Sequence, residues 1–175
     1  MTNIQAPDAG DYRRAAVLTL HHRRGNTAGV LAIVDETNIA DRAVQLLFAV
    51  LGFHKHLILR LRTGEGIDLL ADYVHGIATI DAPADDLAAI DMLRAAQILD
   101  QHGHNDANGI AQVMNAATAD GRPTETFLRL LDHYEVALPE LTSAAGIAWL
   151  EAQAAALAGE EHRPNDQDPG GGSPS

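Results

Sequence analysis

The chain has 175 residues, of which 46% are hydrophobic, 21% charged and 4% aromatic. A chain of this length buries about two thirds of the surface that its unfolded form exposes, so we expect one globular core filled mainly by aliphatic side chains. Because the chain contains no cysteine, disulfide frameworks, thiolate metal sites and cysteine nucleophiles are excluded.

The formal net charge of −12 is unevenly distributed along the chain. Residues 11–62 hold eight basic and four acidic side chains, whereas residues 63–175 hold four basic and nineteen acidic ones. Such an asymmetry favours solubility and also allows attraction between oppositely charged surfaces. No basic leader precedes an apolar segment, and no apolar run reaches the roughly 18 residues of a membrane span. We therefore expect a cytoplasmic protein without a membrane-spanning segment.

The first half of the chain predicts four helices after a flexible arm at residues 1–9. Apolar residues recur at helical spacing from Asp11, and Gly25-Asn26 ends this helix and caps the next one. The third segment, Ala43 to Leu51, is apolar nearly all round, which predicts a buried central helix. Residues 54–62 alternate as a strand does, but the spacing of Phe53, Leu57 and Leu61 also fits a helix, and we favour a helix end and connector. The fourth helix is expected at residues 65–77.

In the second half, Asp81 and Pro83 mark the expected start of a helix that leads into residues 94–103. Asp106 is the expected cap of the next helix, and Pro123 suits the first turn of the third, whose apolar segment is closed by Asp132. The fourth helix is predicted at residues 143–157. The tail, residues 159–175, is rich in Gly, Pro and Asp, so we expect it to be disordered.

The two halves resemble each other at an offset of about 80 residues. Residues 14–34, RAAVLTLHHRRGNTAGVLAIV, match residues 94–114 at five identical positions and at several apolar ones. The alignment then needs one inserted residue, so that Phe53 matches Tyr134, and returns to the offset of 80 from Leu61 onward. We therefore predict an all-α fold of two tandem four-helix copies, residues 10–80 and 81–158, packed as one pseudo-twofold helical domain.

The nine histidines raise the question of a metal site. Di-iron bundles need Glu-x-x-His motifs on two helices, and the nearest match is Asp72 to His75, whose counterparts in the second half are alanines. His54, His56, Asp72 and His75 are therefore weak metal candidates, and no cofactor is predicted. His22 and His102 are repeat-equivalent, and two hypotheses remain open for them: they cap the ends of their helices, or they face a common groove that holds a ligand.

A second hypothesis concerns a basic face that could contact phosphates. Its six residues are Arg13, Arg14, Arg23, Arg24, Arg60 and Arg62. No aromatic residues are interleaved with them, and the rest of the chain is acidic, so a nucleic-acid-associated accessory protein is an alternative only. Asp85, Asp86 and Asp91 are expected on a solvated helix face. The glycine and serine motifs of acyl transfer, nucleotide hydrolysis and nicotinamide binding are absent.

The main hypothesis is a non-enzymatic interaction or scaffold module. The central apolar segment has hydrophobic side chains on more sides than a small bundle covers, which indicates a partner protein or a homodimer. The expected interaction residues are Val44, Leu47, Phe48, Leu51 and Phe53. A metal-dependent enzyme that uses the His and Asp candidates is the third alternative.

Overall fold

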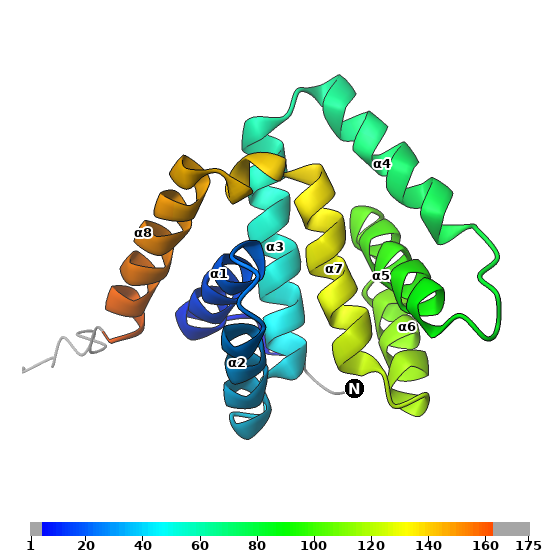
Figure 1. The fold of residues 1–175 in the computed structure, drawn as a ribbon, viewed down its shortest axis with the longest axis horizontal. Coiled ribbons are helices and arrows are strands. Elements are labelled where there is room, and N and C mark those ends of the chain that lie inside the picture. The colour runs from blue at the N-terminus through cyan, green and yellow to red at the C-terminus, as the bar shows by residue number, and fades with distance from the viewer. Residues whose placement is uncertain (1–4, 163–175) are drawn as a thin grey trace, which may run out of the picture.

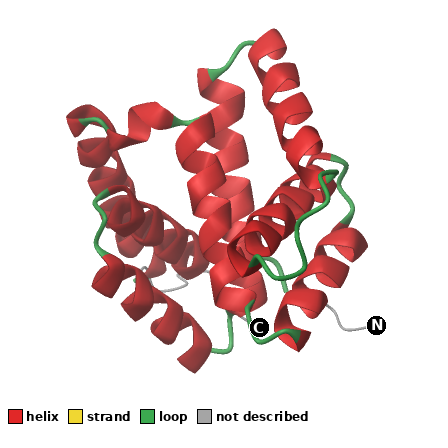
Figure 2. Cartoon of the chain, turned by 45° about the vertical axis from the view of Figure 1, so that its right-hand side comes forward, coloured by secondary structure: helices red, strands yellow, loops and turns green. Residues whose placement is uncertain are grey.

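The computed structural model describes residues 5–162, and every regular element in that range is helical (Figures 1 and 2). The elements of the first half are α1 (Ala9–Arg23), α2 (Thr27–Ile39), α3 (Ala43–Leu61) and α4 (Gly64–Ala78). Those of the second half are α5 (Leu87–Gly103), α6 (Ala107–Ala119), α7 (Pro123–Ala137), the short 3₁₀ helix η1 (Pro139–Thr142) and α8 (Ala144–Glu161). The predicted all-α class is confirmed.

Element boundaries recur at a spacing of 80 residues. The helices α2 and α6 begin and end 80 residues apart, and so do the first residues of α3 and α7 and of α4 and α8. Positive backbone φ angles recur as well, at Gly25 and Asn105 and again at Asp41 and Gly121. The third helices therefore keep the offset without an inserted residue, which corrects the sequence alignment: the position that matches Tyr134 is His54.

The packing follows a corresponding pattern. The helices α3 and α7 lie side by side in the centre, with α1 and α2 on one side and α5 and α6 on the other (Figure 1). α4 extends from the top of α3 and packs on α5, whereas α8 leaves the centre in the opposite direction and packs on α1. Each fourth helix thus covers the first helix of the other half.

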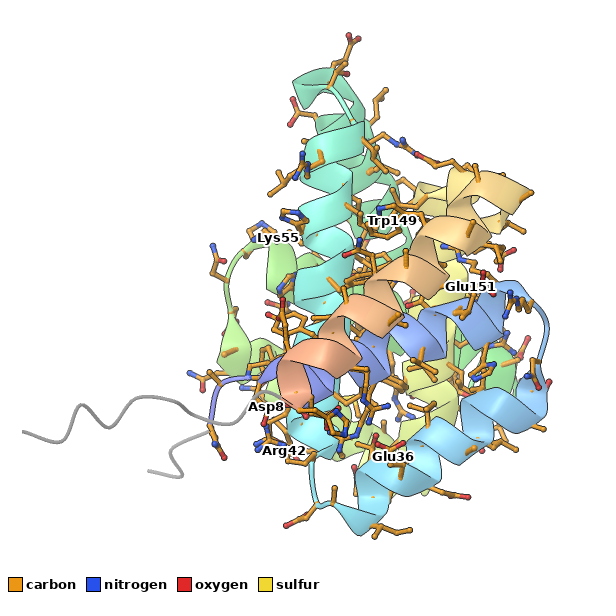
Figure 3. The ribbon with its side chains drawn as sticks, turned by 90° about the vertical axis from the view of Figure 1, so that its left-hand side faces the viewer. Asp8, Glu36, Arg42, Lys55, Trp149 and Glu151 are labelled. Carbon is orange, nitrogen blue, oxygen red and sulfur yellow. The ribbon has the colours of Figure 1, made fainter. Side chains whose placement is uncertain are left out.

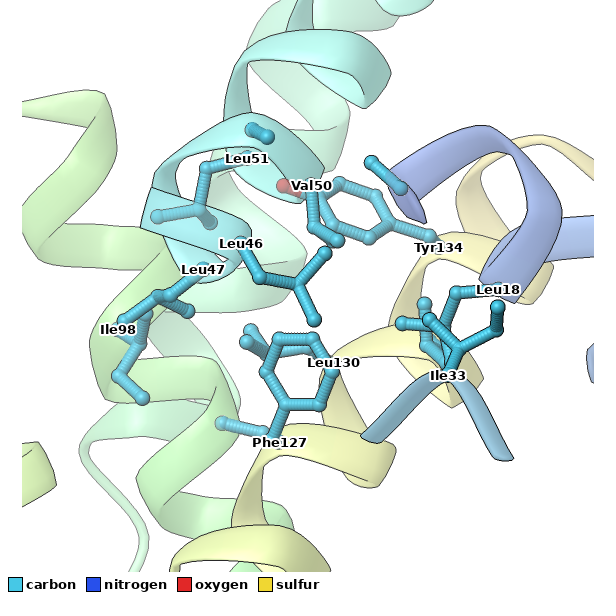
Figure 4. Close-up of a cluster of buried hydrophobic side chains, with 14 of the residues drawn as sticks. Leu18, Ile33, Leu46, Leu47, Val50, Leu51, Ile98, Phe127, Leu130 and Tyr134 are labelled. Atoms are coloured by element: carbon cyan, nitrogen blue, oxygen red, sulfur yellow. The ribbon is translucent and has the colours of Figure 1, made fainter. Parts of the chain in front are cut away.

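The largest core cluster lies where α3 and α7 meet the surrounding helices (Figure 4). Leu51, Leu130 and Ile98 are fully buried there, and Leu46 and Phe127 fill the space between α3 and α7. The predicted central helix is therefore present and buried from Leu46 to Leu51 on its inner face, whereas Val44 in its first turn is exposed. α3 runs ten residues beyond Leu51 to Leu61. Residues 54–61 are helical throughout, so the apolar stripe of α3 continues through Leu57. The connector from α3 to α4 is therefore short.

Several predicted helix ends differ from the observed ones. Asp86, whose side chain accepts the backbone N–H of Ala89, caps α5 in place of Asp81. α7 continues past Asp132 to Ala137 because Leu130, Leu131 and Tyr134 share one buried face. α8 continues to Glu161, which is the third residue of the predicted tail, and residues 163–175 lie outside the described range. Of the predicted arm, residues 5–9 are described: Ala9 is the first residue of α1, Asp8 caps that helix, and Gln5 accepts a hydrogen bond from Arg42.

One described helix, α3, is long and apolar enough to cross a membrane by length and composition alone. It is the central core helix of this fold, and partial burial of such a helix fits a soluble protein. The cytoplasmic location stays a prediction.

Candidate functional site

An apolar cleft of about 400 Å³ opens between the two halves, over the first turns of α3 and α7. We call it the central cleft. Its walls are α2 and α6, its floor includes Leu46, Leu47 and Phe127, and none of its lining residues carries a charge at neutral pH. Thr37 belongs to the lining, but its hydroxyl donates to the Ile33 carbonyl at 2.8 Å. Such a surface favours an uncharged, apolar occupant.

Both halves contribute matching positions to the central cleft. Five pairs of lining residues stand 80 positions apart, namely Val34 and Met114, Asn38 and Thr118, Ala43 and Pro123, Val44 and Thr124, and Leu47 and Phe127. The cleft therefore lies where equivalent parts of the two halves face each other.

Three of the five predicted interaction residues, Val44, Leu47 and Phe48, line this cleft. Val44 is 46% exposed at its mouth. Leu51 is fully buried in the core, and Phe53 lies in a second pocket between α3 and α8. The structure thus brings three of these residues together on one surface and separates the other two from it.

Below the cleft, the rings of His54 and Tyr134 stack at the crossing of α3 and α7, with centroids 4.0 Å apart and planes 9° from parallel. The Nδ1 of His54 lies 2.9 Å from the Val50 carbonyl, so the ring donates there and its Nε2, which is buried, has no partner among the described residues. Burial lowers the pKa of His54 to about 3 and raises the pKa of Tyr134. Both rings are therefore neutral over the physiological range.

The low pKa of His54 predicts a loss of stability in mild acid. The unfolded chain binds this proton near pH 6.5 and the folded chain near pH 3, so the contribution is complete above pH 6.5 and falls as the pH drops toward 3. Between pH 7.5 and 5.0 the free energy of unfolding should fall by about 2 kcal/mol through His54 alone. In His54→Phe, which keeps a stacking ring, urea unfolding should show a correspondingly smaller fall in the free energy of unfolding between these two pH values. A fall equal to that of the native chain would refute the assignment of this pH dependence to His54. The half-buried His102 and the buried His133 also have lowered pKa values, and they contribute to the remaining dependence of stability on pH.

Two buried aspartate–arginine pairs flank the central cleft. Asp11 is fully buried and accepts hydrogen bonds from Arg42, and Asp91, 1% exposed, accepts them from Arg122 at 2.9 and 2.5 Å. The members of the two pairs again stand 80 positions apart. Each pair joins the start of the first helix of a half to the start of its third helix. Burial alone would raise the pKa of Asp11, but Arg42 and the Asp8 backbone N–H outweigh it and lower that pKa.

The second pair corrects one prediction, because Asp91 does not lie on a solvated face. Its carboxylate also accepts the hydroxyl of Thr126 at 3.3 Å. The sequence signal for these pairs is the offset of 80 residues, at which an aspartate matches an aspartate and an arginine matches an arginine. A pair that is fixed in this way positions helices and is not available for catalysis.

The four metal candidates do not meet in the structure. His54 is buried beneath the cleft, His56 faces the pocket between α3 and α8, and Asp72 and His75 lie on α4, where His75 is 3.3 Å from Asp100. Between residues 5 and 162 no group of three or more His, Asp or Glu side chains is arranged to hold a metal ion.

The repeat-equivalent histidines lie in the last turns of α1 and α5, as predicted. His22 Nε2 is 2.9 Å from the Asp132 carboxylate of α7. His102 is partly buried, and that burial together with the positive charge of Lys55 on α3 lowers its pKa. Each ring thus contacts or faces the third helix of the other half, and neither lines the central cleft.

The predicted basic face is largely neutralised within the chain. Arg13 and Arg14 share the Glu36 carboxylate, at 2.6 and 2.9 Å, and Arg23 is buried and donates to the Tyr134 carbonyl at 2.7 Å. The other pairs are Arg13 with Glu161, Arg24 with Glu151 and Arg62 with Glu140. Basic residues of the first half therefore meet acidic residues of the second, as the charge asymmetry allows. Within residues 5–162, Arg23 and Arg60 form no ion pair with an acid, and of these two only Arg23 donates hydrogen bonds, to the Tyr134 carbonyl and the Thr142 hydroxyl.

Comparison with known proteins adds no relative: no family model, no curated protein and no solved structure matches this chain.

Proposed function

We propose that the chain is an internally duplicated, non-enzymatic interaction module, and that it self-associates through the central cleft. The duplication is supported by the recurrence of helix starts, positive φ angles and buried aspartate–arginine pairs at one offset. Three unrelated kinds of feature share that spacing. An approximate twofold axis then passes between α3 and α7, next to the stacked His54 and Tyr134.

The observation that carries the interaction function is the central cleft itself, an uncharged apolar surface that is open to solvent. A partner that covers it gains by removing apolar area from water, at about 25 cal/mol per Å². The lining offers a few hydroxyl and amide groups and no acid, base or nucleophile arrangement for chemistry. This composition is typical of a binding surface.

The side chains on the two walls of the central cleft favour a second copy of the chain as the partner. On α6 the cleft is lined by the small residues Ala107 and Ala111. The position on α2 that is equivalent to Ala111 is Leu31, which is 47% exposed and lies one helical turn before Val34. In a twofold dimer, Leu31 of each copy would enter the space above the alanines of the other, as an isologous interface requires.

The alternatives have less support. Nucleic-acid binding requires arginines that are free for phosphates, and most of the predicted basic face is engaged in internal pairs. A metal-dependent enzyme requires its ligands to converge, and the four candidates lie apart along α3 and α4.

Light scattering tests the self-association. We expect the native chain to have about twice the 18.6 kDa mass of one chain. Val44→Asp places a charge at the cleft mouth, and Leu31→Asp places one on the side chain that would enter the cleft of the other copy. Both variants should give monomers, because burying an unpaired carboxylate is strongly unfavourable. The matched control is Leu59→Asp on α3, since Leu59 is 58% exposed outside the cleft. A monomeric native chain would overturn the proposal.

A further inference from the structure

A second pocket of about 680 Å³ lies between α3 and α8. It exists because α8 packs on α1 and η1 and so leaves a space beside α3. Leu57, Leu61, Leu141 and Leu157 provide aliphatic surface, and Tyr12, Phe53 and Trp149 provide aromatic surface. Figure 3 shows Trp149 on α8 at the side that faces α3.

The aromatic part of this pocket is organised. The Trp149 ring stacks on Phe53, with centroids 6.0 Å apart and planes 28° from parallel. Trp149 is still 37% exposed, so the ring keeps accessible surface. Flat aromatic groups bind well against such a surface, because stacked rings gain energy beyond their buried area.

The same pocket contains the two basic side chains His56 and Arg60, which stand one helical turn apart on α3. Both are exposed, and within the part of the chain that the structure describes neither forms an ion pair. Among the described residues that line the pocket, Glu140 is the only acid. It binds Arg62 with both oxygens, at 2.6 and 2.9 Å, and this contact lowers the pKa of Glu140. Within residues 5–162, the Arg60 guanidinium therefore faces the pocket without an opposing carboxylate, in a chain whose net charge is −12.

The corresponding surface of the other half lacks this chemistry. The positions 80 residues from His56 and Arg60 are Val136 and Glu140, and the position equivalent to Trp149 is Leu69. The combination of cation and indole is thus specific to one side of the molecule. A difference of this kind indicates a ligand site that is independent of the symmetric features of the fold.

We propose that the pocket between α3 and α8 binds a small aromatic molecule with a single negative charge, such as an aromatic carboxylate. Arg60 holds the anionic group, with His56 beside it, and the aromatic body lies against Trp149 and the leucines. The guanidinium suits this role because its planar donors match the geometry of a carboxylate. This inference does not depend on the central cleft or on self-association.

Two matched dyes test the proposal on the full chain. One is 8-anilinonaphthalene-1-sulfonate, an aromatic anion, and the other is N-phenyl-1-naphthylamine, which has the same ring system without the charge. Trp149 is the only tryptophan in the chain. Binding of the anionic dye in this pocket should therefore quench the tryptophan emission through energy transfer as the dye emission rises.

We expect Arg60→Ala to weaken binding of the anionic dye about tenfold, which is the effect of losing one charge-assisted hydrogen bond. Binding of the neutral dye should be unchanged. Gln153→Glu, a nearly isosteric change in the pocket lining, should also weaken binding of the anionic dye, because it adds a negative charge to the pocket. The control Arg129→Ala removes an exposed arginine on α7 and should change neither dye. Equal affinity of the native chain and Arg60→Ala for the anionic dye would overturn the proposal. The proposal would also be overturned if the bound dye left the Trp149 emission unquenched and lost its own emission in Val44→Asp, because the dye would then bind in the central cleft.

Discussion

Replacing Gly146 by alanine is expected to destabilise the fold by about 3 kcal/mol or more, because overpacking against a fixed backbone has no low-energy relief. Gly146 lies in the first turn of α8, against η1. A Cβ at this position would overlap the backbone carbonyl oxygen of Glu140 and would lie 2.6 Å from the Cα of Leu141. Neither atom belongs to a flexible side chain, so α8 would have to move away from η1.

The equivalent glycine of the first half provides the control. Gly66 occupies the same position in α4, and a Cβ there meets nothing closer than the Thr63 hydroxyl at 3.4 Å. Gly66→Ala should therefore be neutral or stabilise the chain by up to about 1 kcal/mol through helix propensity. Chemical unfolding of both variants measures the difference. Similar effects of the two substitutions would show that η1 does not hold α8 as described.

Replacing Asp91 by alanine is the second large effect, with an expected loss of about 3 kcal/mol, because one charge of a buried pair loses its partner. The side chain of Arg122 is 26% exposed and can recover some hydration. The loss in free energy of unfolding should therefore lie at the lower end of the range for such pairs. Asp11→Ala should cost less, because Arg42 keeps the Asp8 carboxylate as a partner at 2.9 Å. Urea unfolding of the single variants provides both values.

A surface pair and a double replacement separate charge from packing. Asp120 pairs with Arg94 but is 57% exposed, so Asp120→Ala should cost less than about 1 kcal/mol. Replacing Asp91 and Arg122 together by leucine and methionine should recover most of the loss, because no unpaired charge remains. A double variant as unstable as Asp91→Ala would mean that the pair contributes mainly through its shape.

The helical class and most helix starts followed from sequence because capping residues and apolar spacing act locally. Asn26, Asp106 and Ser143 each cap a helix through their side chains, near the predicted position in every case. Helix ends were less predictable. α3 continues to Leu61 because Leu57 packs against residues of η1 and α8, which are distant in the sequence.

The apolar excess of the third segment is visible in the sequence, and it includes three residues that line the cleft, Val44, Leu47 and Phe48. Other features depend on where the fourth helices pack. The packing of α8 on α1 places Glu161 beside Arg13 and Glu151 beside Arg24, so it neutralises part of the predicted basic face. It also creates the pocket in which Phe53, His56 and Arg60 come together, although each had been assigned to a different hypothesis. Sequence periodicity contains no information on which helix covers which.

Self-association through the central cleft is tested most directly by the distance between two copies across it. The chain has no cysteine, so Val44→Cys takes a single spin label at the cleft mouth. A twofold dimer through the cleft predicts dipolar modulation of a two-spin system with one short, narrow distance, and dilution with unlabelled chain should reduce that modulation. Isolated spins at concentrations where the native chain is dimeric, or a long and broad distance, would contradict the account.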